Sequence, residues 1–204
     1  MKKYITSDWH LDHNNICGAD GFVSTREQFT SVDEMNEHII SAINSVVTNS
    51  DELYHLGDIG MNNKPKRVFE LLCQIKGQIH LFKGNHDGSK VLKYIKNHNF
   101  QLPDGREKFV VYEVGTIVKR NGVQYYLTHY PMGLGEYRRK MRSICGHIHE
   151  QEAREANCIN VGIDSPELPI DQPFAVPLEL ETAMDLVDTK WNKWFEQVSR
   201  LTSD

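Results

Sequence analysis

The first half of the chain alternates short apolar runs with segments whose apolar residues recur every three or four positions. Residues 30–47 show the helical spacing clearly, because Met35, Ile39 and Ile43 fall on one face. Ser31 and Glu34 have the spacing of a capping box at a helix start. The same pattern predicts strands within residues 2–10, 51–58 and 78–87, and helices over residues 64–77 and 90–98. Strand and helix in alternation are typical of a largely parallel sheet covered by helices.

The second half follows a different pattern. Residues 108–131 alternate apolar and polar side chains and contain Asn121–Gly122, a dipeptide that strongly favours a hairpin turn. Residues 142–149 and 158–164 predict two further short strands. We therefore expect an α/β fold in which two mixed sheets form a layered sandwich with helices outside, the second sheet being richer in antiparallel pairs.

The end of the chain predicts one more amphipathic helix over residues 183–201. Its apolar side chains are spaced three or four apart, at Met184, Val187, Trp191, Trp194, Val198 and Leu201. We expect this helix to pack back on the domain, with a seam between two copies as the alternative. We expect a single domain over residues 1–204, with residues 175–204 as a C-terminal helical appendage.

Composition narrows the class of protein. Apolar residues make up 39% of the chain and charged residues 25%, which is enough for a core. The net charge of -5 argues against a surface that coats membranes or extended duplex nucleic acid. No apolar run approaches the roughly 20 residues of a membrane helix, and charge and histidine follow the first residues too early for a signal peptide.

The four cysteines lie far apart and form no C-x-x-C pair, so we expect reduced thiols in the core rather than a disulfide framework. Together with the missing membrane and export signals, this predicts a cytoplasmic protein, and we expect a monomer or a weak dimer.

Ten histidines stand out, because most of them lie in short clusters with Asp, Asn and Gly. Five such clusters each follow a strand-like run: Asp8 with His10, Asp58, Asn85 with His86 and Asp87, His129, and His147 with His149. Ligands of open α/β sheets bind outside the carboxyl ends of the strands, so the clusters are expected to converge. A single loop histidine is usually only solvated, but five clusters together favour a metal site.

The residue types suit a pair of metal ions. Three carboxylate or amide oxygens and four imidazoles are enough for two divalent ions with one shared ligand. Mixed nitrogen and oxygen ligands suit Mn, Fe, Zn or Ni rather than Ca. Two such ions about 3.5–4 Å apart activate a hydroxide and clamp the entering and leaving oxygens of a phosphoryl group.

The series D-W-H, G-D, G-N-H-D, a lone H and G-H-I-H, which spans residues 8 to 149, resembles the calcineurin-like metallophosphoesterases. Residues 160–164 also resemble the closing strand of that family. The resemblance implies a four-layer α/β/β/α sandwich with a two-metal site at the sheet edges. It implies that Asp8, His10 and His149 bind one metal, that Asn85, His129 and His147 bind the other, and that Asp58 bridges them.

The resemblance gives His86 a different role. It implies that this histidine faces the substrate and protonates the leaving oxygen, with Asp87 as its orienting partner; histidine is a common general acid. The Ser/Thr protein phosphatases of this superfamily carry an arginine after G-D and end their motif G-N-H-E. Here the corresponding residues read "GDIGMNN" and "GNHD", so the chain more closely resembles the small stand-alone bacterial and phage phosphoesterases.

We therefore expect a metallophosphoesterase that uses two divalent ions, manganese first among them, to hydrolyse phosphodiester bonds of a small or nucleotide-like substrate. A phosphomonoesterase or a single-strand nuclease with the same site is the alternative. A non-catalytic scaffold, such as the retromer subunit of this fold, is disfavoured because His86 is present with all seven expected ligands.

Two features stay open in the sequence. His13 either reaches the site or lies in a surface loop. Arg138, Arg139 and Arg142 either grip a second phosphate or form a solvated helix face.

Overall fold

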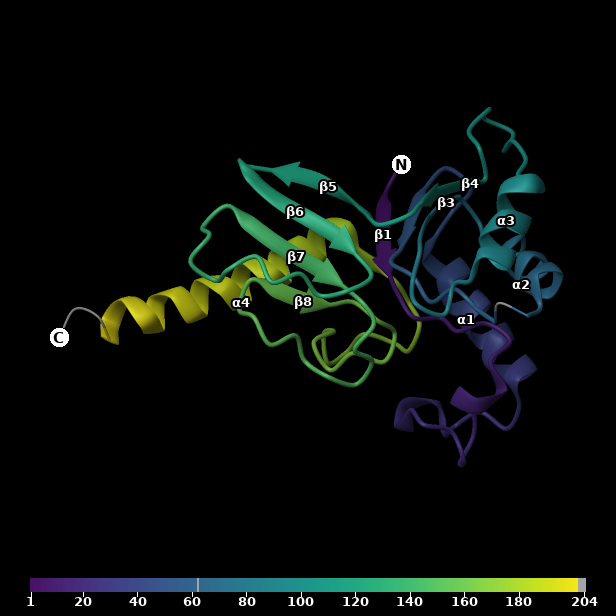
Figure 1. The fold of residues 1–204 in the computed structure, drawn as a ribbon, viewed down its shortest axis with the longest axis horizontal. Helices are drawn as coiled ribbons and strands as arrows, with labels where there is room; N and C mark the ends of the chain where they lie inside the picture. Colours follow the sequence, from purple (N-terminus) through teal and green to yellow (C-terminus); the bar gives the residue numbers. More distant parts are fainter. Residues whose placement is uncertain (62, 202–204) are drawn as a thin grey trace.

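Two mixed β-sheets lie beside each other in the computed structural model, which describes residues 1–61 and 63–201 (Figure 1). The last three residues of the expected appendage, 202–204, lie outside the described residues. In the first sheet the order is β4-β3-β2-β1-β9, with β1 to β4 parallel and β9 antiparallel to β1. Its strands are β1 Lys3–Thr6, β2 Glu52–His55, β3 Gln78–Phe82, β4 Phe109–Tyr112 and β9 Leu178–Glu179.

The second sheet has the order β5-β6-β7-β8. Its strands are β5 Gly115–Arg120, β6 Val123–Thr128, β7 Met141–Cys145 and β8 Cys158–Asn160. β5 and β6 form the predicted hairpin, with Asn121 and Gly122 at φ of 51° and 78°, while β6, β7 and β8 pair in parallel. The predicted α/β sandwich of two mixed sheets flanked by helices is confirmed.

One stretch belongs to a different sheet from the one its pattern suggested. Residues 109–112 were expected in the hairpin region, but they form β4 of the first sheet, parallel to β3. The reason is burial, because Phe109 is 1% exposed in the core beneath the helices, and the Asn99 side chain accepts its backbone N–H at 3.0 Å.

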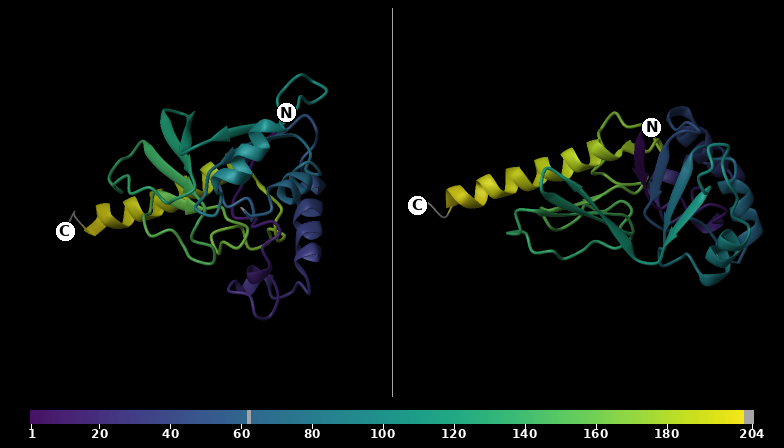
Figure 2. Two further views of the ribbon diagram at one scale, coloured as in Figure 1. Left: turned by 45° about the vertical axis from the view of Figure 1, so that its right-hand side comes forward. Right: turned by 90° about the horizontal axis from the view of Figure 1, so that it is seen from above.

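Three helices cover the face of the first sheet that points away from the second sheet (Figure 2). They are α1 Val32–Val46, α2 Pro65–Leu72 and α3 Ser89–Asn97, and two short 3-10 turns precede them at Asn14–Ile16 and Ser24–Arg26. Ser31 caps α1 as predicted, since its Oγ accepts the N–H of Glu34 at 3.2 Å. The predicted end of α2 at Gly77 is wrong: the helix stops at Leu72, and the buried Lys108 ammonium donates to the carbonyls of Ile75 and Gly77.

The C-terminal helix α4, Leu180–Leu201, packs against β7 and β8 and reaches β1 and β9 at its N-terminal end. Its residues Met184, Val187 and Trp191 are buried, whereas Leu201 is 79% exposed. α4 therefore packs back on the domain as predicted as far as Phe195, and its C-terminal end projects beyond the domain (Figures 1 and 2).

Two of the three undecided arginines hold this helix. Arg142 is buried, its Nε donates to Asp188 at 3.0 Å, and its guanidinium lies 4.2 Å from the ring centre of Trp191. The Arg139 guanidinium lies 4.7 Å from the ring centre of Phe195. Their contacts are with α4, so we assign them to packing rather than to phosphate binding.

All four cysteines are free. Cys145 and Cys158 are buried as expected, but Cys73 is exposed and Cys17 is half-buried, so a core position was wrong for these two. Within residues 1–61 and 63–201, no helix combines the length and the apolar character needed to span a bilayer.

Candidate metal centre

The polar clusters meet at the carboxyl ends of β1, β2, β3, β6 and β7. Asp8 follows β1 and Asp58 follows β2, each within three residues of the strand end. Asn85 follows β3, His129 follows β6 and His147 follows β7 in the same way. Parallel strands present their carboxyl ends at one edge, so residues up to 141 positions apart in sequence come together, from Asp8 to His149.

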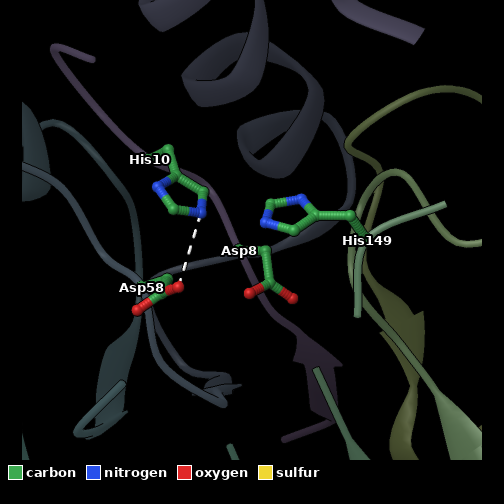
Figure 3. Close-up of side chains that lie close together, drawn as sticks. All are labelled: Asp8, His10, Asp58 and His149. Carbon is green, nitrogen blue, oxygen red and sulfur yellow. Dashed lines mark ion pairs between the residues drawn. The ribbon is translucent and has the colours of Figure 1, made fainter. Parts of the chain in front are cut away.

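Two groups of potential ligand atoms share one carboxylate. The first contains Asp8, His10, Asp58 and His149, and Figure 3 shows these side chains turned toward a common point. The second contains Asp58, His129 and His147. Within each group the ligand atoms lie within 4.8 Å of one another, and the Asp58 Oδ2 lies 3.5 Å from both His10 Nε2 and His129 Nε2.

Asn85 joins the second group. Its Oδ1 lies 2.8 Å from His129 Nε2 and 2.8 Å from His147 Nδ1. The other nitrogen of His129, Nδ1, lies 2.9 Å from the carbonyl oxygen of Leu56, which can only accept, so Nδ1 carries the proton. His129 Nε2 therefore presents a lone pair toward the oxygens of Asn85 and Asp58.

Converging lone pairs of this kind suit a cation. His10 Nε2 is buried and has no hydrogen-bond partner among the described residues, although it points at the Asp58 carboxylate. A buried polar atom is rarely left without a partner. Two imidazole nitrogens and carboxylate oxygens at these positions match the ligand chemistry of mid-row divalent metals, so the residues fit such ions.

The backbone is turned into the left-handed region at most of these positions. Asp8, His10, Asp58, His147 and His149 all have positive φ, between 45° and 73°. A non-glycine residue pays a conformational penalty there, and such residues gather at functional sites. The tight turns aim the side chains back across the strand ends instead of out into solvent.

Glycines beside the ligands make room for this crowding. A Cβ on Gly84 would lie 2.2 Å from Asp58 Oδ1, and a Cβ on Gly146 would lie 2.5 Å from Asp8 Oδ2. The glycines of G-N-H-D and G-H-I-H therefore let two strand ends approach the carboxylates of two others.

A buried ion pair that sequence reasoning missed supports the first group from behind. Arg26 is 0% exposed, and its Nη2 donates to Asp164 Oδ2 at 2.7 Å and to the carbonyl oxygen of Asp8 at 2.5 Å. Asp164 Oδ2 also lies 3.1 Å from His149 Nδ1, so this carboxylate orients the imidazole. The position of Asp164 at the end of the strand predicted over residues 158–164 was a signal for it; Arg26 carries no sequence signal of its own.

Burial shifts the pKa of several of these groups. Desolvation raises the pKa of Asp8 to about 7, with the nearby Asp58 charge adding to the shift, and desolvation lowers the pKa of His10 well below its ordinary value. Burial would raise the pKa of Asp164 too, but the Arg26 charge and the hydrogen bonds from His149 and Arg26 outweigh it and lower that pKa. A cation bound by the first group would favour the ionised form of Asp8.

His86 lies at the solvent side of the centre. Its side chain is exposed, its ring centre lies 5.1 Å from that of His10, and its backbone N–H donates to Asp58 Oδ1 at 2.8 Å. The turn therefore fixes His86 beside the shared carboxylate while leaving its ring open to a substrate.

Asp87 has a different task from the one expected. Its carboxylate was expected to orient the His86 ring, but it accepts the backbone N–H groups of Asp58, Ile59 and Gly84 at 2.7 to 2.8 Å. None of the side-chain contacts among the described residues joins it to the His86 ring. The turn directs this buried carboxylate inward, so Asp87 ties the loops after β2 and β3 together and positions His86 only through the backbone.

His13 belongs to the site rather than to the surface. It is 8% exposed, and its Nδ1 lies 3.3 Å from Nδ1 of His10, so one of the two nitrogens donates to the other. The exposed ring of Phe22 lies 5.9 Å from the His13 ring and 6.3 Å from the His149 ring. Ser24 and Thr25 donate to Glu150, which ties this loop to the G-H-I-H segment and leaves a cavity of about 400 Å³ between them.

Comparison with known proteins places the chain in a family. The profile of the calcineurin-like phosphoesterase superfamily domain matches residues 1–181, and the chain belongs to this family. It is 30% identical over 188 residues to an uncharacterized protein of Methanocaldococcus jannaschii, covering 92% of each chain. The family assignment makes the protein a metallophosphoesterase, in the class of phosphoric ester hydrolases that depend on divalent metals.

A solved structure has a similar fold. A protein of unknown function from Aquifex aeolicus superposes with a TM-score of 0.61 at 21% sequence identity, covering 91% of this chain and 98% of that one. At this identity the likeness concerns the fold alone.

Proposed function

We propose that the protein is a phosphodiesterase that acts on a small or nucleotide-like phosphoester with the help of two divalent metal ions. The observation that carries the proposal is the pair of ligand groups that share Asp58, with the unpartnered His10 Nε2 in one and the lone pair of His129 in the other. Asp8, His10 and His149 would hold one ion, and Asn85, His129 and His147 the other. Manganese is the first candidate, with Fe, Zn and Ni as alternatives.

When bound, two such ions supply a Lewis acid for the phosphoryl oxygens and lower the pKa of a water molecule. The residues of the chain would position the metal ligands and supply a proton. Arg26 and Asp164 hold Asp8 and His149 in place, and the Asp87 carboxylate holds the turn that carries His86. His86, exposed at the mouth of the centre, would donate a proton to the leaving oxygen.

The lining of the cavity beside the centre favours a diester over a monoester. Its residues are Phe22, Val23 and 147–151, and this set contains no lysine or arginine. A phosphomonoester brings one more negative charge than a diester near neutral pH, and that charge would find no cationic side chain in this lining. A single-strand nuclease would need a basic track for the backbone, which the lining also lacks.

The test is hydrolysis by the metal-loaded protein. We expect release of p-nitrophenolate from bis(p-nitrophenyl) phosphate with Mn(II), lost on adding a chelator and restored by Mn(II), with Ni, Zn and Mg tested in parallel. Faster hydrolysis of p-nitrophenyl phosphate would favour the phosphomonoesterase, and faster cleavage of a single-stranded oligonucleotide would favour the nuclease. No turnover of any ester with any metal would refute the proposal.

A cytoplasmic location and a monomeric or weakly dimeric state complete the proposal. Sedimentation of the purified protein across a concentration series measures the second of these.

A further inference from the structure

An apolar cavity of about 300 Å³ lies beside the second ligand group, on the face of the second sheet formed by β5 and β6. Ile117 and Tyr126 form one cross-strand pair of its lining, and Gly115 and Thr128 form the next. Tyr130 and Met132, which follow β6, close one side. The volume accommodates one aromatic ring with room to spare.

Two of the four hydroxyl groups in this lining are engaged. The Thr128 hydroxyl donates to the carbonyl oxygen of Tyr130 at 2.7 Å, and the Tyr126 hydroxyl donates to the Gln124 side chain at 2.9 Å. The rest of the lining is mostly hydrocarbon and aromatic ring. A group that enters the cavity would thus meet few free hydrogen-bonding partners, which favours an apolar ring over a nucleobase with polar edges.

Tyr130 connects the cavity with the metal centre. Its ring is 51% exposed, and its centre lies 4.7 Å from that of His147 and 5.0 Å from that of His129. Tyr130 also belongs to the lining of the cavity. A substituent on a phosphate held at the second ligand group therefore needs to pass only one tyrosine ring to enter it.

The position of His86 bears on which of the two ester substituents of a bound phosphodiester lies toward the cavity. His86 lies beside His10 and His13, with ring centres 5.1 Å and 6.0 Å apart, on the side of the first ligand group. Tyr130 lies against the second group. A leaving oxygen directed at His86 leaves the side of Tyr130 and the cavity open to the other ester substituent, the one that is retained.

We infer that the protein prefers phosphodiesters whose retained substituent is an apolar aromatic ring, bound in the cavity beside Tyr130. This inference rests on the proposed phosphodiesterase activity and adds the substrate class. In the reaction the oxygen of water bonds to phosphorus and the bond from phosphorus to the leaving oxygen breaks. The products are one phenol or alcohol and one aromatic phosphomonoester, and the protons of water are shared between them and the solvent.

The experiment uses three diesters with one leaving group. Phenyl p-nitrophenyl phosphate, methyl p-nitrophenyl phosphate and thymidine 5′-(p-nitrophenyl phosphate) all release p-nitrophenolate and differ only in the retained substituent. We expect the wild-type protein with Mn(II) to show a kcat/KM about tenfold higher for the phenyl ester than for the methyl ester. The reason is that burial of a phenyl ring favours binding by a free energy that corresponds to a factor of about ten. The thymidine ester is expected to fall below the phenyl ester.

Ile117→Lys provides the matched test, because Ile117 is 48% exposed on β5 and tolerates a charged residue without loss of the core. In this variant we expect the phenyl-to-methyl ratio to fall to near one. Ile170→Lys is the control: it adds the same charge at a fully exposed isoleucine outside the cavity lining, and the ratio should stay at the wild-type value. Ile117→Ala, with a smaller fall in the ratio, is a second variant if Ile117→Lys folds poorly.

The outcomes separate this inference from the function on which it rests. Hydrolysis of all three esters with equal kcat/KM, or a phenyl-to-methyl ratio that Ile117→Lys leaves unchanged, would refute binding of the aromatic substituent in the cavity. Either result would still support the proposed phosphodiesterase activity. A thymidine ester preferred over the phenyl ester would also refute binding in the cavity, in favour of nucleoside recognition elsewhere. No hydrolysis of any of the three would refute the proposed function and this inference together.

Discussion

The candidate metal centre has two halves that differ in burial and in support. The buried half consists of Asp8, His10 and Asp58, each at most 1% exposed. The open half consists of Asn85, His86 and His147, of which the first two are exposed and the third is half-buried. Arg26, fully buried, holds the backbone of the buried half, whereas the open half borders an apolar cavity through Tyr130.

Under the proposed function, both halves would hold metal, and only the open half would also admit substrate. Charged ligands removed from water need fixed partners, and a missing partner leaves a charge that is costly to bury. The open half carries exposed side chains that exchange with water and with substrate. Substitutions in the buried half should therefore change metal content and folding, whereas substitution of His86, which is not among the proposed ligands, should change turnover alone.

The largest contrast is expected between Asp58→Ala and His86→Ala. His86→Ala should lower kcat for a p-nitrophenyl diester by about 10²–10⁴-fold, because a general acid is lost, while metal content stays near the wild-type value. Asp58→Ala removes the carboxylate common to both ligand groups, so metal content and turnover should fall together. Elemental analysis of the purified variants and steady-state kinetics measure both quantities.

The matched control is His98→Ala, an exposed histidine at the end of α3, which should change neither quantity. Equal loss of metal in the Asp58 and His86 variants would contradict the separation and would make His86 a ligand.

Removing Arg26 should have the next largest effect, on folding. Arg26→Met leaves the buried Asp164 carboxylate without its cation, and we expect the free energy of unfolding to fall by about 3–5 kcal/mol. Arg67→Met, which breaks an exposed 2.8 Å ion pair with Asp33, is the control and should lower it by less than about 1 kcal/mol. Urea denaturation of metal-free protein measures both, and equal losses would show that the buried pair is no stronger than a surface one.

The Arg26–Asp164 ion pair also predicts how the stability of the folded protein changes with pH. The pKa of Asp164 is lowered in the folded protein, so its contribution to stability is present above the unfolded value of 3.8 and is lost as the pH falls through the folded pKa. The stability advantage of wild type over Asp164→Asn should therefore shrink below pH 3.8, by up to about 1.4 kcal/mol per pH unit. Denaturation of both proteins in chelator, from pH 6 down to the lowest pH at which they remain folded, measures this difference. A difference in stability that does not change with pH would contradict the prediction.

The smallest effect is expected at Phe22, in the loop over the centre. Its ring is 59% exposed and lies near His13 and His149, so Phe22→Ala should lower kcat/KM for a diester by about threefold, as expected for one lost aromatic contact. Stability should change by no more than about 0.5 kcal/mol. Phe100→Ala, at another exposed phenylalanine, should leave kcat/KM unchanged; an equal fall in both variants would remove Phe22 from the site.

Features that depend on neighbours in sequence were predicted well. The cap at Ser31 and the hairpin at Asn121–Gly122 lie where the pattern put them, because each is decided by the backbone preferences of a few adjacent residues. The residues of both ligand groups were also named in advance, since each follows a strand whose end is visible in the sequence. Their binding of metal stays a prediction.

Features that depend on distant segments were missed or were wrong. α2 stops at Leu72, and the ammonium of Lys108, which lies just before β4, donates to the carbonyls of Ile75 and Gly77. Asp87 binds backbone amides of another loop instead of the adjacent histidine.

The chain's pattern of residues was thus sufficient for the order of elements, the fold class and the set of ligand types, because these rest on local propensity and on the edge where parallel strands end. The left-handed turns, the Arg26–Asp164 pair and the cavity behind Tyr130 came only with the folded chain. The Arg26–Asp164 pair joins residues 138 positions apart, and such a contact forms only when packing brings distant segments together. The turns and the cavity lie within short stretches of the chain, but their shape depends on the side chains packed around them.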